Sequence, residues 1–269
     1  MRNLDFPTPR RILYLLVIWV FGAVVLSYPF LFPPKKLDPF DEQNIAPYTE
    51  QKMPNFSEIF PVVVRKKAFF NYLLPAIRHH NRVIIEKRTF LKEIKSVIEQ
   101  NQPLNTLQQT RLDSLITEYR VDPKQELSEI VSCLLRKVDV IPAELVLMQA
   151  ANESAWGTSR FAKQGFNFFG LWCFREGCGF VPKRRNEGAV HEVAKFTSLE
   201  YAVSTYFRNI NRHQAYAQLR DIRAKLRNSN QQITAEKLAK GLKNYSERGD
   251  EYIKELIQMI RFNRKFLPA

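Results

Sequence analysis

The chain has 269 residues, of which 45% are hydrophobic and 25% charged, a globular composition that excludes wholesale disorder, a collagen-like repeat and a disulfide-rich miniprotein. Its nine glycines argue against glycine-rich phosphate-binding loops. The 41 basic residues exceed the 27 acidic ones and give a net charge of +14, which calls for an anionic partner or surroundings. Nucleic acid, a membrane surface and an acidic polymer all meet that requirement.

An uncharged apolar run extends from Ile12 to Phe32, and its length is sufficient to cross a hydrocarbon core of roughly 30 Å. Arg10 and Arg11 precede the run, and this positive charge favours a cytoplasmic location for residues 1–11. We therefore expect an uncleaved transmembrane anchor over 12–32, with the rest of the chain outside the cytoplasm. A cleaved signal peptide and a buried core helix are the alternatives, but the run is long for a signal peptide and no A-x-A site ends it.

Residues 33–61 contain six prolines and no apolar periodicity, which predicts a linker between the anchor and a globular part. Residues 1–62 hold six basic and six acidic side chains, so the whole charge excess lies beyond them. Because the globular part is expected outside the cytoplasm, we expect no nucleic-acid partner. An anionic envelope polymer or a lipid head group becomes the better candidate.

Apolar residues at helical spacing predict a mainly α fold with a short β or loop lobe. The glycine-rich stretch 165–196 is expected to form that lobe. Two successive helices are expected within 62–98, and the others over 106–119, 126–137, 142–156, 199–210, 216–226, 234–242 and 252–262.

The expected helix over 142–156 is apolar nearly all round, yet its last turn carries Glu153. The negative end of the helix dipole disfavours the ionised carboxylate. Trp156 has the same effect, because it lies three residues on and hence on the same face of the helix. A carboxyl group kept protonated near neutral pH can serve as a general acid, for example toward a glycosidic oxygen. Alternatively, Glu153 turns into solvent as the helix ends.

Three segments resemble the bacterial glucosaminidases of glycoside hydrolase family 73: AANESAWG at 150–157, NFFG at 167–170 and NYS at 244–246. This resemblance covers residues 125–265. The added helices within 62–124 and the Cys173-x4-Cys178 spacing resemble the Bax-like branch of that family. The chain departs mildly from the family pattern, with Ala155 for the usual Gly and Phe168 for the usual Leu.

The resemblance implies a lysozyme-like helical domain over 125–269, preceded by a helical N-terminal extension over 62–124. The implied activity is that of a peptidoglycan hydrolase, an endo-β-N-acetylglucosaminidase that cleaves glycan strands after N-acetylglucosamine without a cofactor. Glu153 matches the family's acid, and Tyr245 matches a tyrosine near the cleaved sugar. Asn167, Phe169 and Trp156 are expected to bind substrate, although a structural role for Asn167 and Phe169 is equally open.

Glycosidases usually pair the acid with a second carboxylate. Glu187 is our first choice because family members with a second essential Glu carry it in the mobile lobe, before the strand that corresponds to 193–196. Glu192 is the second choice, and Glu176 is a further candidate. Alternatively, the sugar's own acetamido group replaces this carboxylate, and Tyr245 steadies it.

Cys173 and Cys178 are expected to form a disulfide, because an envelope compartment permits one and Gly177 suits a tight turn between them. A metal site is the alternative, but no nearby Cys or His completes a tetrahedral set, because Cys133 lies before the helix of Glu153 and His191 would be a lone addition. We therefore expect no metal.

Two other functions stay open at this point: a lytic transglycosylase or muramidase on the same fold, and a catalytically idle glycan-binding envelope protein. In each case we expect the chain to be anchored in the inner membrane, with its globular part in the periplasm. The sequence does not define an oligomeric state.

Overall fold

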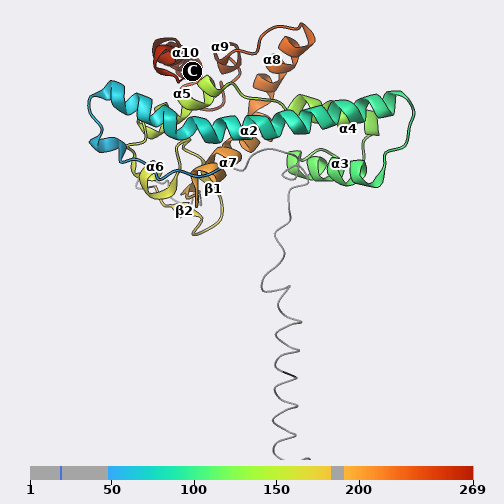
Figure 1. Cartoon of the computed structure of the whole chain (residues 1–269), viewed down its shortest axis with the longest axis horizontal. Coiled ribbons are helices and arrows are strands. Elements are labelled where there is room, and N and C mark those ends of the chain that lie inside the picture. Colours follow the sequence, from blue (N-terminus) through green and yellow to red (C-terminus); the bar gives the residue numbers. More distant parts are fainter. Residues whose placement is uncertain (1–18, 20–47, 183–190, 269) are drawn as a thin grey trace, which may run out of the picture. The chain divides into compact units, whose positions relative to one another are not determined.

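A computed structural model describes Trp19, residues 48–182 and residues 191–268 (Figure 1). The chain divides into two compact units, Met1–Asp38 and Pro39–Ala269. Within the described residues, no helix has both the length and the apolar character needed to cross a membrane. The expected anchor over 12–32 lies outside the described residues except for Trp19, so it stays a prediction.

The described part of Pro39–Ala269 is mainly helical, which confirms the predicted class of fold (Figure 1). Short 3-10 turns, η1 (Phe56–Glu58), η2 (Gln214–Tyr216) and η3 (Arg264–Phe266), precede or follow several of the helices. The helices are α2 (Val62–Glu99), α3 (Thr106–Tyr119), α4 (Leu127–Lys137), α5 (Ala143–Ser154), α6 (Arg160–Gly165), α7 (Leu199–Arg212), α8 (Ala217–Asn228), α9 (Ala235–Ala239) and α10 (Asp250–Asn263).

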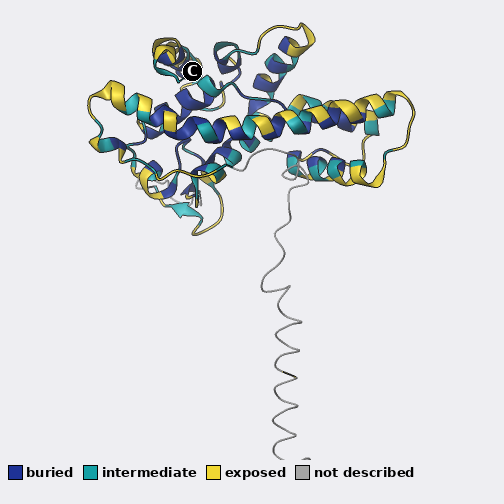
Figure 2. Cartoon of the chain, viewed as in Figure 1, coloured by how far each residue is buried: buried dark blue, intermediate teal, exposed yellow. Residues whose placement is uncertain are grey.

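Helix α2 is one continuous helix where the sequence pattern predicted two. Its 38 residues extend for about 57 Å, and it packs against α4, α5 and α7 (Figure 1). Pro75 lies inside the helix and lacks the amide proton of an ordinary residue. The helix continues through this position because a buried stripe runs along its length, including Leu73 before Pro75 and Ile77 after it (Figure 2). Tertiary packing thus outweighs the local cost of the proline.

The glycine-rich stretch forms a small antiparallel sheet, which confirms the predicted β lobe. Strands β1 (Trp172–Cys173) and β2 (Gly179–Phe180) flank β3 (Glu192–Ala194) in the order β1-β3-β2. Trp172 and Phe180 both lie opposite Val193 in this register.

The predicted disulfide between Cys173 and Cys178 is present and closes the turn between β1 and β2. Both sulfur atoms lie near the Glu192 carboxylate, as ligands of a metal ion would. That carboxylate instead accepts hydrogen bonds from the amides of Gly177, at 3.0 Å, and Gly179, at 2.7 Å. The disulfide and Glu192 therefore fix the same turn.

Replacing both Cys173 and Cys178 with Ser should release this turn. A disulfide that closes so short a loop contributes about 2 kcal/mol through the entropy of the open chain. Amides of the turn, such as that of Gly179, should then exchange with solvent about 30-fold faster, as measured by hydrogen-exchange mass spectrometry. Cys133→Ser removes the free cysteine and serves as the control. Unchanged exchange in the double variant would show that Glu192 alone holds the turn.

The described end of the expected linker over 33–61 packs on the helical domain. Phe56 is buried and makes edge contacts with Phe69 and Tyr72 of α2. A Cβ atom at Gly157 would approach the Phe56 ring to 2.4 Å, so only glycine permits this contact. The described end of the segment forms only the short turn η1, and its prolines do not prevent an aromatic side chain from entering the core.

Candidate active site

The C-terminus of α5 turns abruptly just after Glu153. The helix ends at Ser154, whose hydroxyl donates to the Ala150 carbonyl at 2.6 Å and accepts from the Gly157 amide at 2.9 Å. Ala155, Trp156 and Gly157 all have positive φ angles, of 49°, 59° and 78°. The predicted end at Trp156 is therefore two residues too late, and Trp156 does not share a helical face with Glu153.

Trp156 instead joins the end of α5 to α2. Its ring centroid lies 5.7 Å from that of Phe69 and 5.6 Å from that of Phe70, both in edge-to-face geometry. The Lys66 ammonium lies 4.7 Å from the same ring, in a cation–π contact. These contacts give Trp156 a structural role in attaching the N-terminal extension, whereas its expected role in substrate binding stays a prediction.

The Glu153 carboxyl group is half-buried and lies against the turn formed by residues 167–170. Gly170 has a φ of +63°, and a Cβ atom at this position would lie 3.4 Å from Oε2 of Glu153. The left-handed backbone explains the need for glycine, and it brings this turn close to the carboxyl oxygen. The segments 150–157 and 167–170, which the sequence pattern singled out separately, thus meet at the Glu153 carboxyl group.

Asn167 builds that turn from inside the protein. Its side-chain amide donates to the carbonyls of Leu171 and Ala194, both at 2.8 Å, and its oxygen accepts from the Leu171 amide at 3.0 Å. The residue is 1% exposed. Asn167 therefore connects the turn to β3, which favours the structural one of its two expected roles.

Phe169 is equally buried and connects the same turn to Tyr206 and Tyr245. Its ring stacks on Tyr206 of α7, with centroids 4.3 Å apart, and its carbonyl accepts a hydrogen bond from the Tyr245 hydroxyl at 2.8 Å. The turn beside Glu153 is thus held both from α7 and from the segment before α10. The charge of Glu153 contributes to the raised pKa of Tyr245, and the expected role of Tyr245 near the cleaved sugar stays a prediction.

Four tyrosines gather around Glu153: Tyr206, Tyr216, Tyr245 and Tyr252. The ring of Tyr245 lies 5.6 Å from that of Tyr252 and 5.9 Å from that of Tyr216. Burial and, to a smaller extent, the negative charge of Glu153 raise the pKa of each phenol. The tyrosines are therefore neutral, and one of them, Tyr252, forms a hydrogen bond with Glu153.

Burial raises the pKa of the Glu153 carboxyl group above its usual value. Hydrogen bonds from Tyr252 and Asn152 oppose this effect in part, and the charge of Glu255 adds to it. The carboxyl group also lies at the negative end of the α5 dipole, which disfavours its ionised form. The site therefore holds a carboxylic acid that can donate a proton at a higher pH than a solvent-exposed glutamic acid.

Gln149 and Tyr252 extend this site beyond the residues predicted from sequence. The Gln149 side chain, fully buried one turn before Glu153, donates to the Tyr252 hydroxyl at 3.1 Å and accepts from the Tyr206 hydroxyl. The Tyr252 hydroxyl is thereby directed to donate to Glu153. A glutamine within the apolar middle of this helix, four residues before the acid, is the signal that could have identified this network.

Tyr252→Phe should shift the pH dependence of activity. The Tyr252 hydrogen bond stabilises the ionised form of Glu153, so its loss raises the pKa of this carboxyl group further. Because a general acid acts when protonated, the alkaline limb of the kcat/KM profile should move to higher pH. The profile is measured on purified sacculi, with Tyr201→Phe, a change at an exposed tyrosine, as the control. An alkaline limb that stays in place would contradict the role given to Tyr252.

The three candidates for a second carboxylate differ in position. Glu192 is 4% exposed and uses both oxygens to bind backbone amides, which fits a structural role better than a catalytic one. Glu176 is exposed in the turn between the two cysteines. Glu187 lies outside the described residues, so its role stays a prediction.

The helical fold places an acid at the end of a buried helix, against a glycine turn. Comparisons with known proteins identify the family. The family model described as mannosyl-glycoprotein endo-β-N-acetylglucosaminidase matches residues 129–265, so the chain belongs to the glucosaminidase family. Protein bax of Escherichia coli (strain K12) is 34% identical over 207 residues, which cover 76% of this chain and 72% of that protein. This similarity is longer than the family domain and supports the resemblance to the Bax-like branch. No solved structure matches the chain.

Proposed function

We propose that the protein is an endo-β-N-acetylglucosaminidase that cleaves peptidoglycan glycan strands, with Glu153 as the general acid. The observation that carries this proposal is the environment of Glu153. Its carboxyl group has a raised pKa, lies against the backbone of Gly170 and receives a hydrogen bond from Tyr252. Membership of the glucosaminidase family supports a glycoside hydrolase in particular.

In the proposed reaction, Glu153 protonates the oxygen that leaves the anomeric carbon of N-acetylglucosamine. Protonation makes this oxygen a better leaving group as positive charge develops on the sugar ring. Glu187 is our candidate for the second carboxylate. If the acetamido group of the sugar takes that part, Tyr245, whose hydroxyl is held by the Phe169 carbonyl, is positioned to steady it.

The bond that is cleaved can be identified from the products. Purified sacculi are digested, the fragments are reduced with borohydride, and the reduced sugar is identified by mass spectrometry. Reduced N-acetylglucosamine is the expected end group. Reduced muramic acid would indicate a muramidase, and 1,6-anhydromuramic ends would indicate a lytic transglycosylase; each would contradict the proposed specificity. No release of fragments by the wild type would favour an idle glycan-binding protein.

We also propose that residues 12–32 anchor the chain in the inner membrane and that the catalytic part faces the periplasm. The Cys173–Cys178 disulfide supports an oxidising compartment. The net charge of +14 suits attraction to anionic wall polymers and lipid surfaces, which salt would weaken. A reporter fused after Leu267 tests this location, because a cytoplasmic signal would contradict it.

A further inference from the structure

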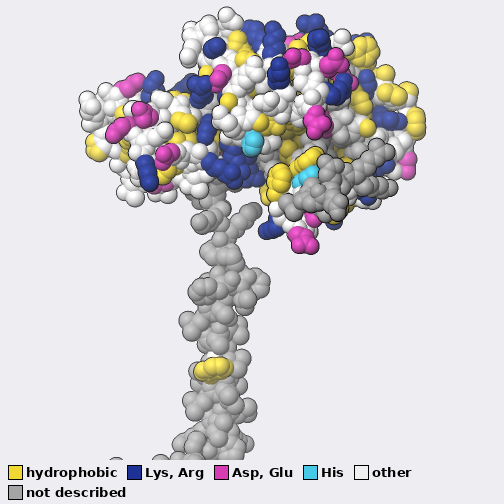
Figure 3. All heavy atoms as spheres, turned by 180° about the vertical axis from the view of Figure 1, so that it is seen from behind, with side chains coloured by type: hydrophobic (Ala, Val, Ile, Leu, Met, Phe, Trp, Pro, Cys, Tyr) yellow, Lys and Arg dark blue, Asp and Glu magenta, His cyan; other side chains and the backbone are white. Residues whose placement is uncertain are grey.

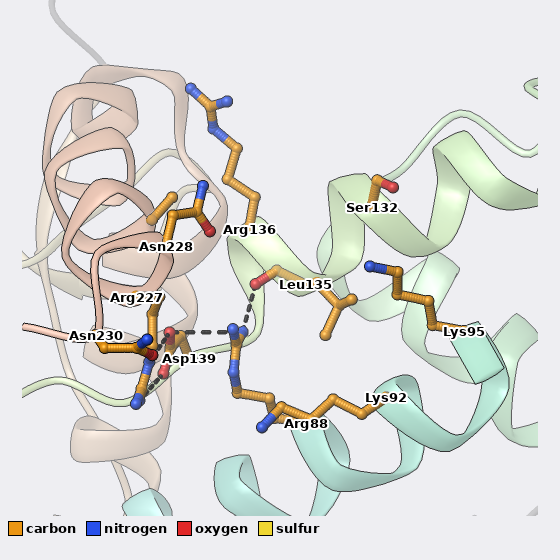
Figure 4. Close-up of a pocket in the computed structure, with 11 residues that line it drawn as sticks. Arg88, Lys92, Lys95, Ser132, Leu135, Arg136, Asp139, Arg227, Asn228 and Asn230 are labelled. Carbon is orange, nitrogen blue, oxygen red and sulfur yellow. Dashed lines mark hydrogen bonds and ion pairs between the residues drawn. The ribbon is translucent and has the colours of Figure 1, made fainter.

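A cavity of about 630 Å³ lies between α2, α4 and α8 (Figure 4). It is well separated from Glu153. Phe69 of α2 packs against Trp156, three residues after Glu153, and Arg88 lies 19 residues beyond Phe69 along α2, a distance of about 28 Å. Basic side chains from three helices surround the cavity, and its lining includes one acidic residue. These residues are Arg88, Lys92 and Lys95 of α2, Arg136 of α4, Arg227 of α8, and the acidic Asp139.

Asp139 is buried at the base of the cavity and orients the arginines around it. Arg227 binds both carboxylate oxygens, at 3.0 and 2.8 Å, and Arg88 lies 3.5 Å from one of them (Figure 4). Outside the lining, Arg223 lies 3.9 Å from the same carboxylate. One carboxylate is thus shared among three guanidinium groups, so a positive charge excess remains.

The two lysines add to this excess at the mouth of the cavity. Lys92 is exposed and forms no ion pair with any described residue. Lys95 is paired with Glu99, at 3.6 Å, in an exposed contact, and it extends from α2 toward Ser132 of α4 (Figure 4). Lys and Arg side chains are widely spread over the domain surface (Figure 3), but here they converge on a cavity from several helices.

We propose that this cavity binds the phosphate group of an organic phosphate, such as a glycerol phosphate unit. A tetrahedral phosphate accepts hydrogen bonds from several directions, which suits cations arriving from both α2 and α8, whereas one planar carboxylate is satisfied by one arginine. Arg136 of α4 is already paired with Asp221. Arg88 and Arg227 are already held in place, so little side-chain freedom is lost on binding.

The rest of the cavity suits the organic part of such a ligand. Its volume falls within the range of small-molecule sites, about 300–1,000 Å³, and exceeds the needs of a bare phosphate ion. Ser132, Asn228 and Asn230 offer hydroxyl and amide groups for the hydroxyls of the ligand, and Leu135 and Ala224 supply apolar surface. A free organic phosphate and a phospholipid head group share this chemistry.

The test is calorimetric titration of the full chain with glycerol 3-phosphate. Lys92→Glu should weaken binding at least tenfold, because it places a negative charge at the mouth of the cavity. Lys225→Glu is the matched control: this lysine is exposed on α8 and lies outside the lining, and the variant has the same net charge. It should change the affinity by less than about threefold, since the field of a distant exposed charge is screened.

Three results would overturn the proposal: no binding of glycerol 3-phosphate, equal weakening by the two variants, or equally tight binding of acetate. Competition by vesicles then identifies the source of the phosphate. If phosphatidylglycerol vesicles displace glycerol 3-phosphate and phosphatidylcholine vesicles do not, the cavity takes an anionic lipid head group. If neither displaces it, the ligand is a water-soluble phosphate. Both of these outcomes support a phosphate site.

Discussion

Replacing Glu153 with Gln should abolish the digestion of purified sacculi. The amide keeps the size of the side chain but cannot donate the proton that the leaving oxygen requires. General acid catalysis typically contributes 10²–10⁴-fold, so we expect a loss of about this size in kcat, measured as soluble fragments released per unit time. The thermal unfolding midpoint should stay within a few degrees of the wild type.

Glu144→Gln is the matched control for that experiment. Glu144 lies in the first turn of the same helix, where it pairs with Arg264 at 2.9 Å on the surface. The pair is bidentate but lies on the surface, so its loss should cost about 1 kcal/mol, and the variant should keep its fold and nearly all of its activity. A Glu153→Gln protein that digests sacculi at more than a tenth of the wild-type rate would contradict the assignment of the acid.

Asp139→Ala should cause the largest loss of stability. The substitution leaves Arg88, Arg223 and Arg227 without the carboxylate that they share, and Arg223 is fully buried. Removing one partner from a buried ionic cluster typically costs 3–5 kcal/mol. The free energy of unfolding in urea should fall by about this amount, whereas Asp221→Ala, which breaks an exposed pair with Arg136, should cost less than about 1 kcal/mol.

The same cluster makes the fold sensitive to acid. Burial alone would raise the pKa of the Asp139 carboxyl group, but the Arg227 hydrogen bond and the charges of Arg223 and Arg88 hold it below its usual value. The contribution of this carboxylate to the free energy of unfolding is therefore complete above its unfolded-state pKa. That contribution is lost as the pH falls through the lower folded-state pKa. Asp139→Asn should lose this part of the pH dependence. Equal stability losses for Asp139→Ala and Asp221→Ala would contradict the account of the cluster.

Much of the fold could be predicted from the sequence because apolar periodicity is a local signal. Apart from α6 (Arg160–Gly165), which the pattern did not predict, the helices after 105 lie within a few residues of their expected positions, and the small sheet lies where glycines gather. The break expected in α2 was wrong, because burial along the whole stripe outweighs the local effect of Pro75. The packing of Phe56 depends on α2 and Gly157, so no local pattern indicates it.

The candidate site was predictable in part, where its signals are local in the sequence. Glu153 could be singled out as an unexpected carboxylate in a buried helix, and the turn with Gly170 could be matched to the family pattern. Tyr252 comes from another helix and meets Glu153 only in the folded chain, so the hydrogen bond by which it lowers the pKa of this carboxyl group could not be predicted. The inference from Trp156 failed because the backbone turns left-handed directly after Ser154.

The central claim is that Glu153 drives hydrolysis at N-acetylglucosamine. It is tested most directly by digesting sacculi in water enriched with ¹⁸O, using wild type and Glu153→Gln in parallel, and analysing the fragments by mass spectrometry. We expect the wild type to yield fragments with ¹⁸O at a reducing N-acetylglucosamine, and the variant to yield almost none. Wild-type fragments that end in unlabelled anhydromuramic acid, or equal labelling by both proteins, would contradict the account.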